Sequence, residues 1–138
     1  MADRIKVGTL ISGGGTNLQA IIDACAEGRI DAEIVFTGSD VPGVRGLERA
    51  QKAGIETFVV DYSHILETLK NNGIKSTDLP ADFDLQEIQT KQRLFDAESG
   101  EKASFFLKSR AIAEKKLLDH ILSYEFDLLV LAGFMRVL

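Results

Sequence analysis

Residues 6–22 read KVGTLISGGGTNLQAII: an apolar run, then three consecutive glycines, then a helical pattern. The run KVGTLIS (6–12) predicts a strand. The residues after the glycines repeat apolar side chains at the spacing of one helix face: Leu18, Ile21, Ile22 and Cys25. Glycine costs backbone entropy, so a glycine run at this corner indicates that something approaches the backbone closely. At a helix N-terminus that group is most often an anion.

Three further runs predict strands because each is short, apolar and bounded by small or turn-forming residues: AEIVFTGS (32–39), ETFVVDY (56–62) and DLLVLAG (127–133). The segment VRGLERAQKAG (44–54) predicts a helix between the second and third strands. We expect the first helix to begin at a Thr16–Asn17 cap. The alternation of strands and helices along the chain predicts a doubly wound α/β fold whose mainly parallel sheet has strand order 3-2-1-4. The nearly all-apolar fourth run is typical of a strand buried on both faces.

By its length the chain is one domain, residues 1–138. Roughly 40 residues between the third strand and the next long helix exceed what a compact crossover needs, so residues 64–104 are interpreted as an insertion. Within them, DLQEIQTKQRLF (84–95) predicts a weakly amphipathic helix. The long helix is expected from Phe105 to Tyr124.

Composition excludes several classes of protein. The formal net charge of −5 argues against a nucleic-acid partner. No apolar run approaches the roughly 20 residues of a membrane span, and the N-terminus has no apolar secretory core. A single cysteine, Cys25, allows no internal disulfide. We therefore expect a cytoplasmic protein without membrane or nucleic-acid partners.

The glycine loop fits neither of two well-known phosphate motifs. Gly13 and Gly15 match the start of G-x-G-x-x-G, but Leu18 stands at the third glycine, and no lysine follows as a Walker A loop requires. What remains is a short loop whose N–H groups, with the Thr16 hydroxyl and the Asn17 amide, can cradle one phosphate. A tight turn without a ligand is the alternative.

The second informative stretch is LAGFMRVL (131–138), at the carboxyl end of the fourth predicted strand. Strands one and four are neighbours in a 3-2-1-4 sheet, and their connections leave in opposite directions. The crevice at their carboxyl ends is where such sheets bind ligands. Taken alone, Phe134, Met135 and Val137 fit a core; beside the glycine loop they fit a binding crevice.

Four motifs occur in order: LISGGGTNLQAII (10–22), GLERAQKAGI (46–55), the pair Ser109–Arg110 expected to open the long helix, and DLLVLAGFMRVL (127–138). Together they resemble the N-terminal half of the phosphoribosylglycinamide formyltransferase family, folate-dependent enzymes of purine biosynthesis. The resemblance covers the chain outside residues 64–104. It implies a formyltransferase-like, Rossmann-type fold and transfer of a formyl group from 10-formyltetrahydrofolate to glycinamide ribonucleotide.

The resemblance also implies roles for individual residues. Gly15, Thr16 and Asn17 match the residues that hold the ribonucleotide phosphate. The folate pocket is matched by the last four residues and by one arginine: Met135, Arg136, Val137, Leu138 and Arg110. The planar fork of an arginine suits a carboxylate, although a solvated charge at a helix terminus is the other interpretation of Arg110. No metal is implied.

The family's catalytic asparagine and histidine lie in an Asn-x-His motif, followed later by an aspartate. Neither His64 nor His120 has an asparagine two positions before it, so we expect no catalytic residue in this chain. We expect a truncated form that is inactive alone and exposes its fourth strand, through which a homodimer could form. The alternatives are a formyltetrahydrofolate deformylase, a methionyl-tRNA formyltransferase, and a non-catalytic phosphate- or nucleotide-binding module.

Overall fold

The computed structural model describes residues 4–75, 78–80 and 100–136. The chain divides into two compact units. The first unit contains Met1–Asp61 and Leu118–Leu138, and the second contains Tyr62–Leu117.

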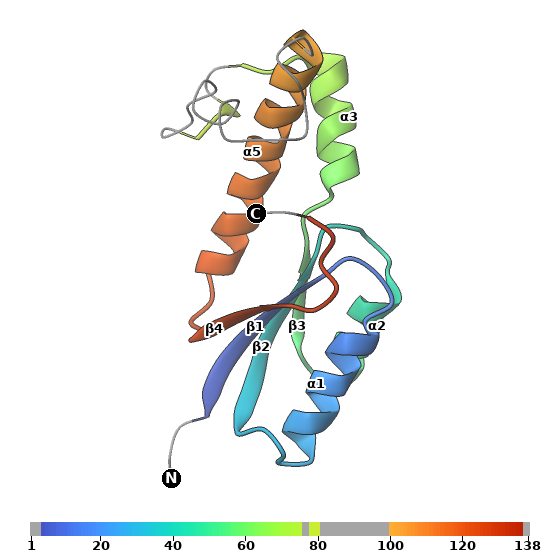
Figure 1. The fold of residues 1–138 in the computed structure, drawn as a ribbon, viewed down its shortest axis with the longest axis vertical. Coiled ribbons are helices and arrows are strands. Elements are labelled where there is room, and N and C mark those ends of the chain that lie inside the picture. The colour runs from blue at the N-terminus through green and yellow to red at the C-terminus, as the bar shows by residue number, and fades with distance from the viewer. Residues whose placement is uncertain (1–3, 76–77, 81–99, 137–138) are drawn as a thin grey trace. The chain divides into compact units, whose positions relative to one another are not determined.

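The first unit is built on a parallel sheet of four strands (Figure 1): β1 (Ile5–Ile11), β2 (Ala32–Ser39), β3 (Glu56–Val59) and β4 (Leu128–Leu131). Their order is β3-β2-β1-β4, which confirms the predicted order and the doubly wound class. From β1 the chain continues outward to β2 and then to β3, whereas β4 pairs with the other side of β1. The direction of the strand order therefore changes between β1 and β4.

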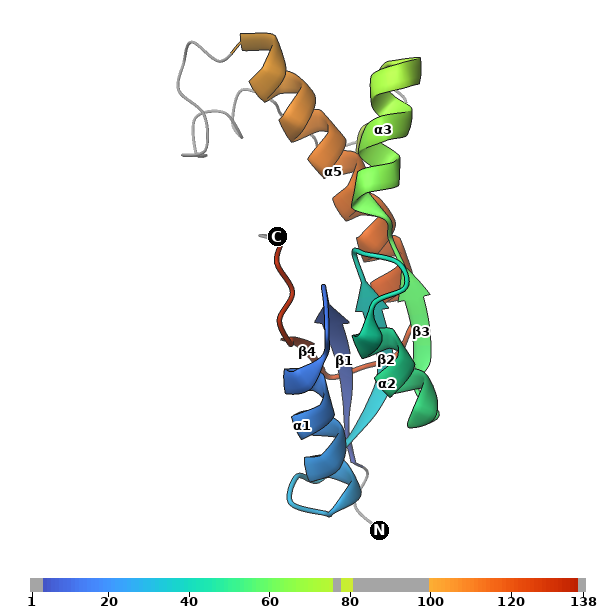
Figure 2. The same cartoon turned by 90° about the vertical axis from the view of Figure 1, so that its right-hand side faces the viewer.

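Two helices, α1 (Thr16–Ala26) and α2 (Arg45–Lys52), pack beside one another on one face of the sheet (Figure 2). Both were predicted within a few residues of their bounds. They bury a core drawn from α1, α2, β1 and the residue after β4: Ile11, Leu18, Leu47, Ala50 and Ala132. Burial of this apolar surface is the main term that holds both helices on the sheet.

The opposite face of the sheet carries aromatic side chains because β2 contains a bulge. Val7 pairs with Ile34 but Gly8 pairs with Phe36, so Val35 is one extra residue in β2. The extra residue reverses the alternation of side chains along the strand, and Phe36 lies on the face away from Ile34. Its ring contacts three other aromatic rings: Phe58, Tyr124 and Phe126.

Two strand glycines make room for these rings. Gly8 lies directly opposite Phe36, and Gly38 lies directly opposite Phe58. A Cβ atom at either glycine would overlap the ring of its partner. Each ring therefore lies over a glycine, where it covers backbone that would otherwise be exposed.

The prediction that the fourth strand is buried on both faces is wrong for the described part of the chain. Leu128 is 53% exposed and Leu131 is 50% exposed. The physical reason is position: β4 pairs with β1 alone and lies at the edge of the described sheet.

The second unit contains α3 (Tyr62–Asn72) and most of α5 (Gly100–Leu122), whose last residues belong to the first unit. The helix α3 was not predicted. The third strand was expected to extend to Tyr62, but β3 ends at Val59 and Tyr62 begins the helix. The signal was present, since Tyr62, Ile65 and Leu69 share one helix face and the first two are buried.

The long helix α5 begins five residues earlier than the predicted Phe105 and ends at Leu122 rather than at Tyr124. The helix predicted over 84–95 lies outside the described residues, and the insertion over 64–104 stays a prediction. Among the residues that the structure describes, no helix is both long and apolar enough to cross a bilayer.

Candidate functional site

The candidate site lies in the first unit, where β1, β2 and β4 end. The loop after β1 carries the glycines, and the loop after β4 carries AGFMR. The N–H of Met135 donates to the Oγ of Ser12 over 2.8 Å. The N–H of Ala132 donates to the carbonyl of Leu10 over 2.9 Å. The structure therefore brings together the two segments that the sequence placed at the switch point of the sheet.

Gly15 shapes the start of α1. It is the N-cap residue and adopts φ 75° and ψ 27°, in the left-handed region, which glycine enters without steric cost. The predicted Thr16–Asn17 cap is wrong, because Thr16 is already the first helical residue and no side chain caps the helix. The side chains of Thr16 and Asn17 are exposed instead.

The loop presents unused backbone donors. Within the described chain, the N–H groups of Gly14, Gly15, Thr16 and Asn17 donate to no protein acceptor. The first hydrogen bond of the helix runs from Gln19 N–H to the carbonyl of Gly15 over 2.8 Å. Four consecutive free donors at the positive end of a helix dipole form an arrangement suited to an anion.

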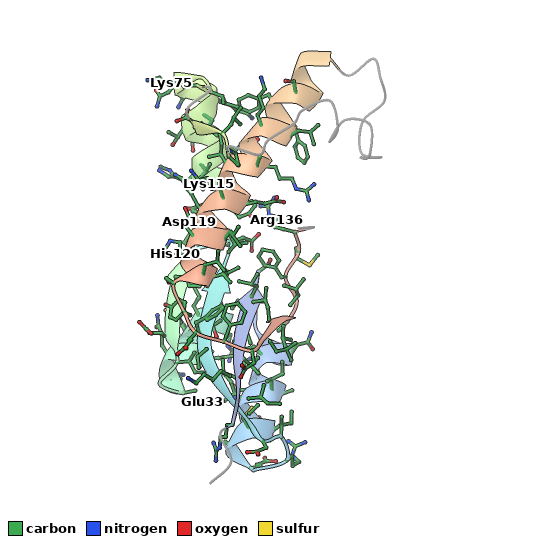
Figure 3. The ribbon with its side chains drawn as sticks, turned by 90° about the vertical axis from the view of Figure 1, so that its left-hand side faces the viewer. Glu33, Lys75, Lys115, Asp119, His120 and Arg136 are labelled. Carbon is green, nitrogen blue, oxygen red and sulfur yellow. The ribbon has the colours of Figure 1, made fainter. Side chains whose placement is uncertain are left out.

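The segment after β4 is held to the end of β2 by an ion pair. The Nε of Arg136 donates to Oδ2 of Asp40 over 2.8 Å, and Figure 3 shows Arg136 in the segment that follows β4. The Asp40 side chain is 2% exposed, whereas that of Arg136 is 41% exposed. A buried carboxylate is costly unless a cation or hydrogen bonds compensate it, so Arg136 is coupled to the position of the chain after β2.

Asp40 was missed by the sequence interpretation. The available signal was its place directly after the strand AEIVFTGS (32–39), at the carboxyl edge of the sheet. Met135 is 81% exposed at this edge. The other two residues matched to the folate pocket, Val137 and Leu138, lie outside the described residues.

Arg110 lies in the second unit, well inside α5 rather than at the helix start expected from the sequence. Its Nε donates to Oε1 of Glu114 over 2.9 Å, one helical turn away. The side chain is partly buried. Arg110 is therefore an ion-paired residue of a helix interior, and the interpretation as a charge at the helix terminus does not hold.

The two histidines lie among side chains that do not belong to the candidate site. His120 stacks on Phe58, with ring centroids 4.8 Å apart and planes 8° from parallel. His64 lies on α3 in the second unit, where it lines a hollow of about 700 Å³ with three lysines: Lys75, Lys115 and Lys116. None of the predicted site residues lines this hollow. The described residues contain no group of three or more His, Cys, Asp or Glu side chains that could hold a metal ion.

Comparison with known proteins agrees with the sequence motifs. A family model described as formyl transferase matches residues 5–138. The chain is 34% identical over 137 residues to the trifunctional purine biosynthetic protein adenosine-3 of Drosophila melanogaster, covering 98% of this chain and 7% of that protein. It is 32% identical over 134 residues to phosphoribosylglycinamide formyltransferase of Escherichia coli (strain K12), covering 97% of this chain and 43% of that enzyme.

A solved structure shows the same fold. Phosphoribosylglycinamide formyltransferase from Coxiella burnetii superposes with a TM-score of 0.60 at 30% identity, covering 98% of this chain and 44% of that one. The chain thus spans less than half the length of each of these relatives.

Proposed function

Since this chain belongs to the formyl transferase family, whose model matches residues 5–138, we propose that it forms the ribonucleotide-binding part of a phosphoribosylglycinamide formyltransferase. The observation that carries the proposal is the run of four unused N–H groups from Gly14 to Asn17, at the start of α1 and beside the segment after β4. The phosphate of glycinamide ribonucleotide is the anion that these donors would bind, with Gly15, Thr16 and Asn17 in contact.

The second part of the proposal assigns the segment after β4 to folate binding. Met135, Arg136, Val137 and Leu138 would contact 10-formyltetrahydrofolate. For Arg110, which lies in the second unit, the proposal is limited to its guanidinium, whose planar fork suits a carboxylate. The Asp40–Arg136 pair supports this assignment, because it fixes the side chain of Arg136 beside the end of β2. No metal ion takes part in the proposed reaction.

The proposed reaction moves a formyl group between two nitrogens. The amine nitrogen of the ribonucleotide attacks the formyl carbon, the bond from that carbon to the folate nitrogen breaks, and the folate nitrogen gains the proton that the amine loses. Such a transfer needs donors for the oxyanion and a group that takes the proton. No Asn-x-His sequence occurs among the 138 residues, so we assign to this chain substrate binding without turnover. The single cysteine and the acidic charge suit a cytoplasmic protein without nucleic-acid or membrane partners.

Calorimetry with glycinamide ribonucleotide and, separately, with a folate analogue tests the proposal. We expect the ribonucleotide to bind and the Gly15→Ala variant to lose that binding. Formyl transfer is then assayed with both substrates present, and we expect none. Binding of an unrelated nucleotide in preference to the ribonucleotide would support the non-catalytic module instead, and release of formate from the folate would support a deformylase.

A further inference from the structure

The helix α2 contacts the glycine loop at two carbonyl groups. The N–H of Gly46 donates to the carbonyl of Gly13 over 3.0 Å. The Nε of Arg49, one turn later on α2, donates to the carbonyl of Gly14 over 2.8 Å. The same guanidinium reaches α1 through Nη1, which donates to Oε1 of Gln19 over 3.3 Å. Arg49 therefore links the loop to both helices that flank it.

These two contacts determine where the loop's donors point. In a trans peptide the C=O of one residue and the N–H of the next point in opposite directions, and no cis peptide occurs in the described chain. Holding the carbonyls of Gly13 and Gly14 against α2 turns the N–H groups of Gly14 and Gly15 away from α2. Both of these N–H groups are among the unused donors of the loop.

The close packing of two glycines reinforces this arrangement. A Cβ atom at Gly15 would lie 2.5 Å from the Cα of Gly46. A Cβ atom at Gly46 would lie 2.9 Å from the carbonyl oxygen of Gly13 and would overlap the side chain of Ile11. The first turn of α2 thus approaches the loop as closely as the backbone allows, which only glycine at both positions permits.

We propose that Arg49 and Gly46 are positioning residues that hold the loop in the conformation in which its N–H groups bind an anion. The inference rests on the proposed function for the identity of the anion, the phosphate of glycinamide ribonucleotide. Neither side chain touches that phosphate in the proposal. Arg49 acts through the carbonyl of Gly14, and Gly46 acts through the carbonyl of Gly13 and the backbone of Gly15.

The test compares two arginines of the same helix. Arg49→Gln removes the contact with Gly14, whereas Arg45→Gln removes the same charge from an exposed residue that lines the same hollow between α1 and α2. We expect Arg49→Gln to weaken ribonucleotide binding by about fivefold to tenfold, which lies within the net value of a typical intramolecular hydrogen bond. Arg45→Gln should change the affinity less than twofold. Arg49→Lys keeps the charge but loses the planar fork, and should resemble Arg49→Gln.

A second readout separates positioning from charge and from general stability. In ligand-free protein, the NMR amide signals of Gly14 and Gly15 should shift in Arg49→Gln and Arg49→Lys but not in Arg45→Gln, while affinity for a folate analogue stays unchanged. Equal weakening by Arg45→Gln and Arg49→Gln, or wild-type behaviour of Arg49→Lys, would overturn the proposal in favour of simple electrostatics. If the wild-type chain binds no ribonucleotide, the proposed function fails, and the amide shifts still decide whether Arg49 sets the loop.

Discussion

At the scale of single residues, the three glycines of the loop are not equivalent. Gly15 has a positive φ and lies against Gly46, so it is needed for both its conformation and its size. A Cβ atom at Gly13 or Gly14 would meet nothing within 4 Å. The requirement for glycine in the folded chain is therefore concentrated at Gly15, although the sequence shows three identical residues.

Replacing Gly15 with alanine should destabilise the protein by about 1–3 kcal/mol, since the left-handed conformation is strained for alanine and the new methyl group overlaps α2. Gly14→Ala is the matched control. It should leave the free energy of unfolding within about 1 kcal/mol of wild type or raise it slightly. Urea unfolding measures both. Equal destabilisation by the two substitutions would show that the conformation of Gly15 is not special.

At the scale of elements, the aromatic face of the sheet depends on matched strand positions. The bulge at Val35 turns Phe36 onto this face, and Gly8 leaves room for its ring. Tyr124, which follows α5, stacks on Phe36 with ring centroids 4.7 Å apart. Offset and tilted aromatic contacts of this kind add to the stabilisation from buried area. The ionisation of the Tyr124 phenol therefore provides a measure of this packing.

Burial raises the pKa of the Tyr124 phenol above its ordinary value of 10.0, and the nearby carboxylate of Glu56 raises it further. The raised pKa means that the folded chain holds the proton after the unfolded chain has lost it. The contribution of Tyr124 to stability is therefore fully present below pH 10.0 and is lost as the pH rises from there through the pKa of the folded state. Ultraviolet titration of the phenolate in a Tyr62→Phe variant, which leaves one tyrosine, measures this pKa.

The Glu56→Gln substitution is the control for the second cause. It should lower the pKa of Tyr124 but leave it above 10.0, because burial is the larger cause. A phenol that titrates at or below its ordinary value in the Tyr62→Phe variant would contradict the stacked, partly buried position of Tyr124.

At the scale of the whole molecule, the notable feature is the free edge of the sheet. Within the described part of the chain, β4 pairs on one side only, and Leu128 and Leu131 are half exposed on it. An apolar edge strand without charge or proline is a template for pairing with another chain. Natural sheet edges are usually protected, so we propose that β4 pairs with a second copy of this chain.

We expect the 138-residue chain to form dimers or larger species in a concentration-dependent way. Leu131→Lys should shift it toward the monomer, because a lysine on an edge strand opposes pairing. Leu122→Lys is the control, since it places the same charge on an exposed leucine of α5, which is 67% exposed. Size-exclusion chromatography with light scattering measures the mass of each variant. A wild-type chain that stays monomeric at all concentrations would show that β4 is not an interface.

Much of the fold follows from local pattern. Short apolar runs, the glycines that end helices and the spacing of Leu18, Ile21 and Ile22 are properties of neighbouring residues, and they sufficed for the strand order 3-2-1-4 and for placing the glycine loop beside AGFMR. The helix α3 was missed although its pattern is also local, because its polar residues and the Asn-Asn-Gly sequence after Lys70 resemble a loop.

The remaining features are contacts between distant residues and the exposure of β4, and they depend on the tertiary structure. Asp40 and Arg136 are 96 residues apart in sequence and meet because β2 and β4 both flank β1. The contact of Arg49 with Gly14 depends on how α2 packs against α1, and the exposure of β4 depends on its place at the sheet edge. The sequence by itself determined most of the strands and helices and the place of the glycine loop, because those features depend on local propensity and periodicity. Which side chains hold that loop depends on strand register and helix packing, which arise only when distant segments are brought together.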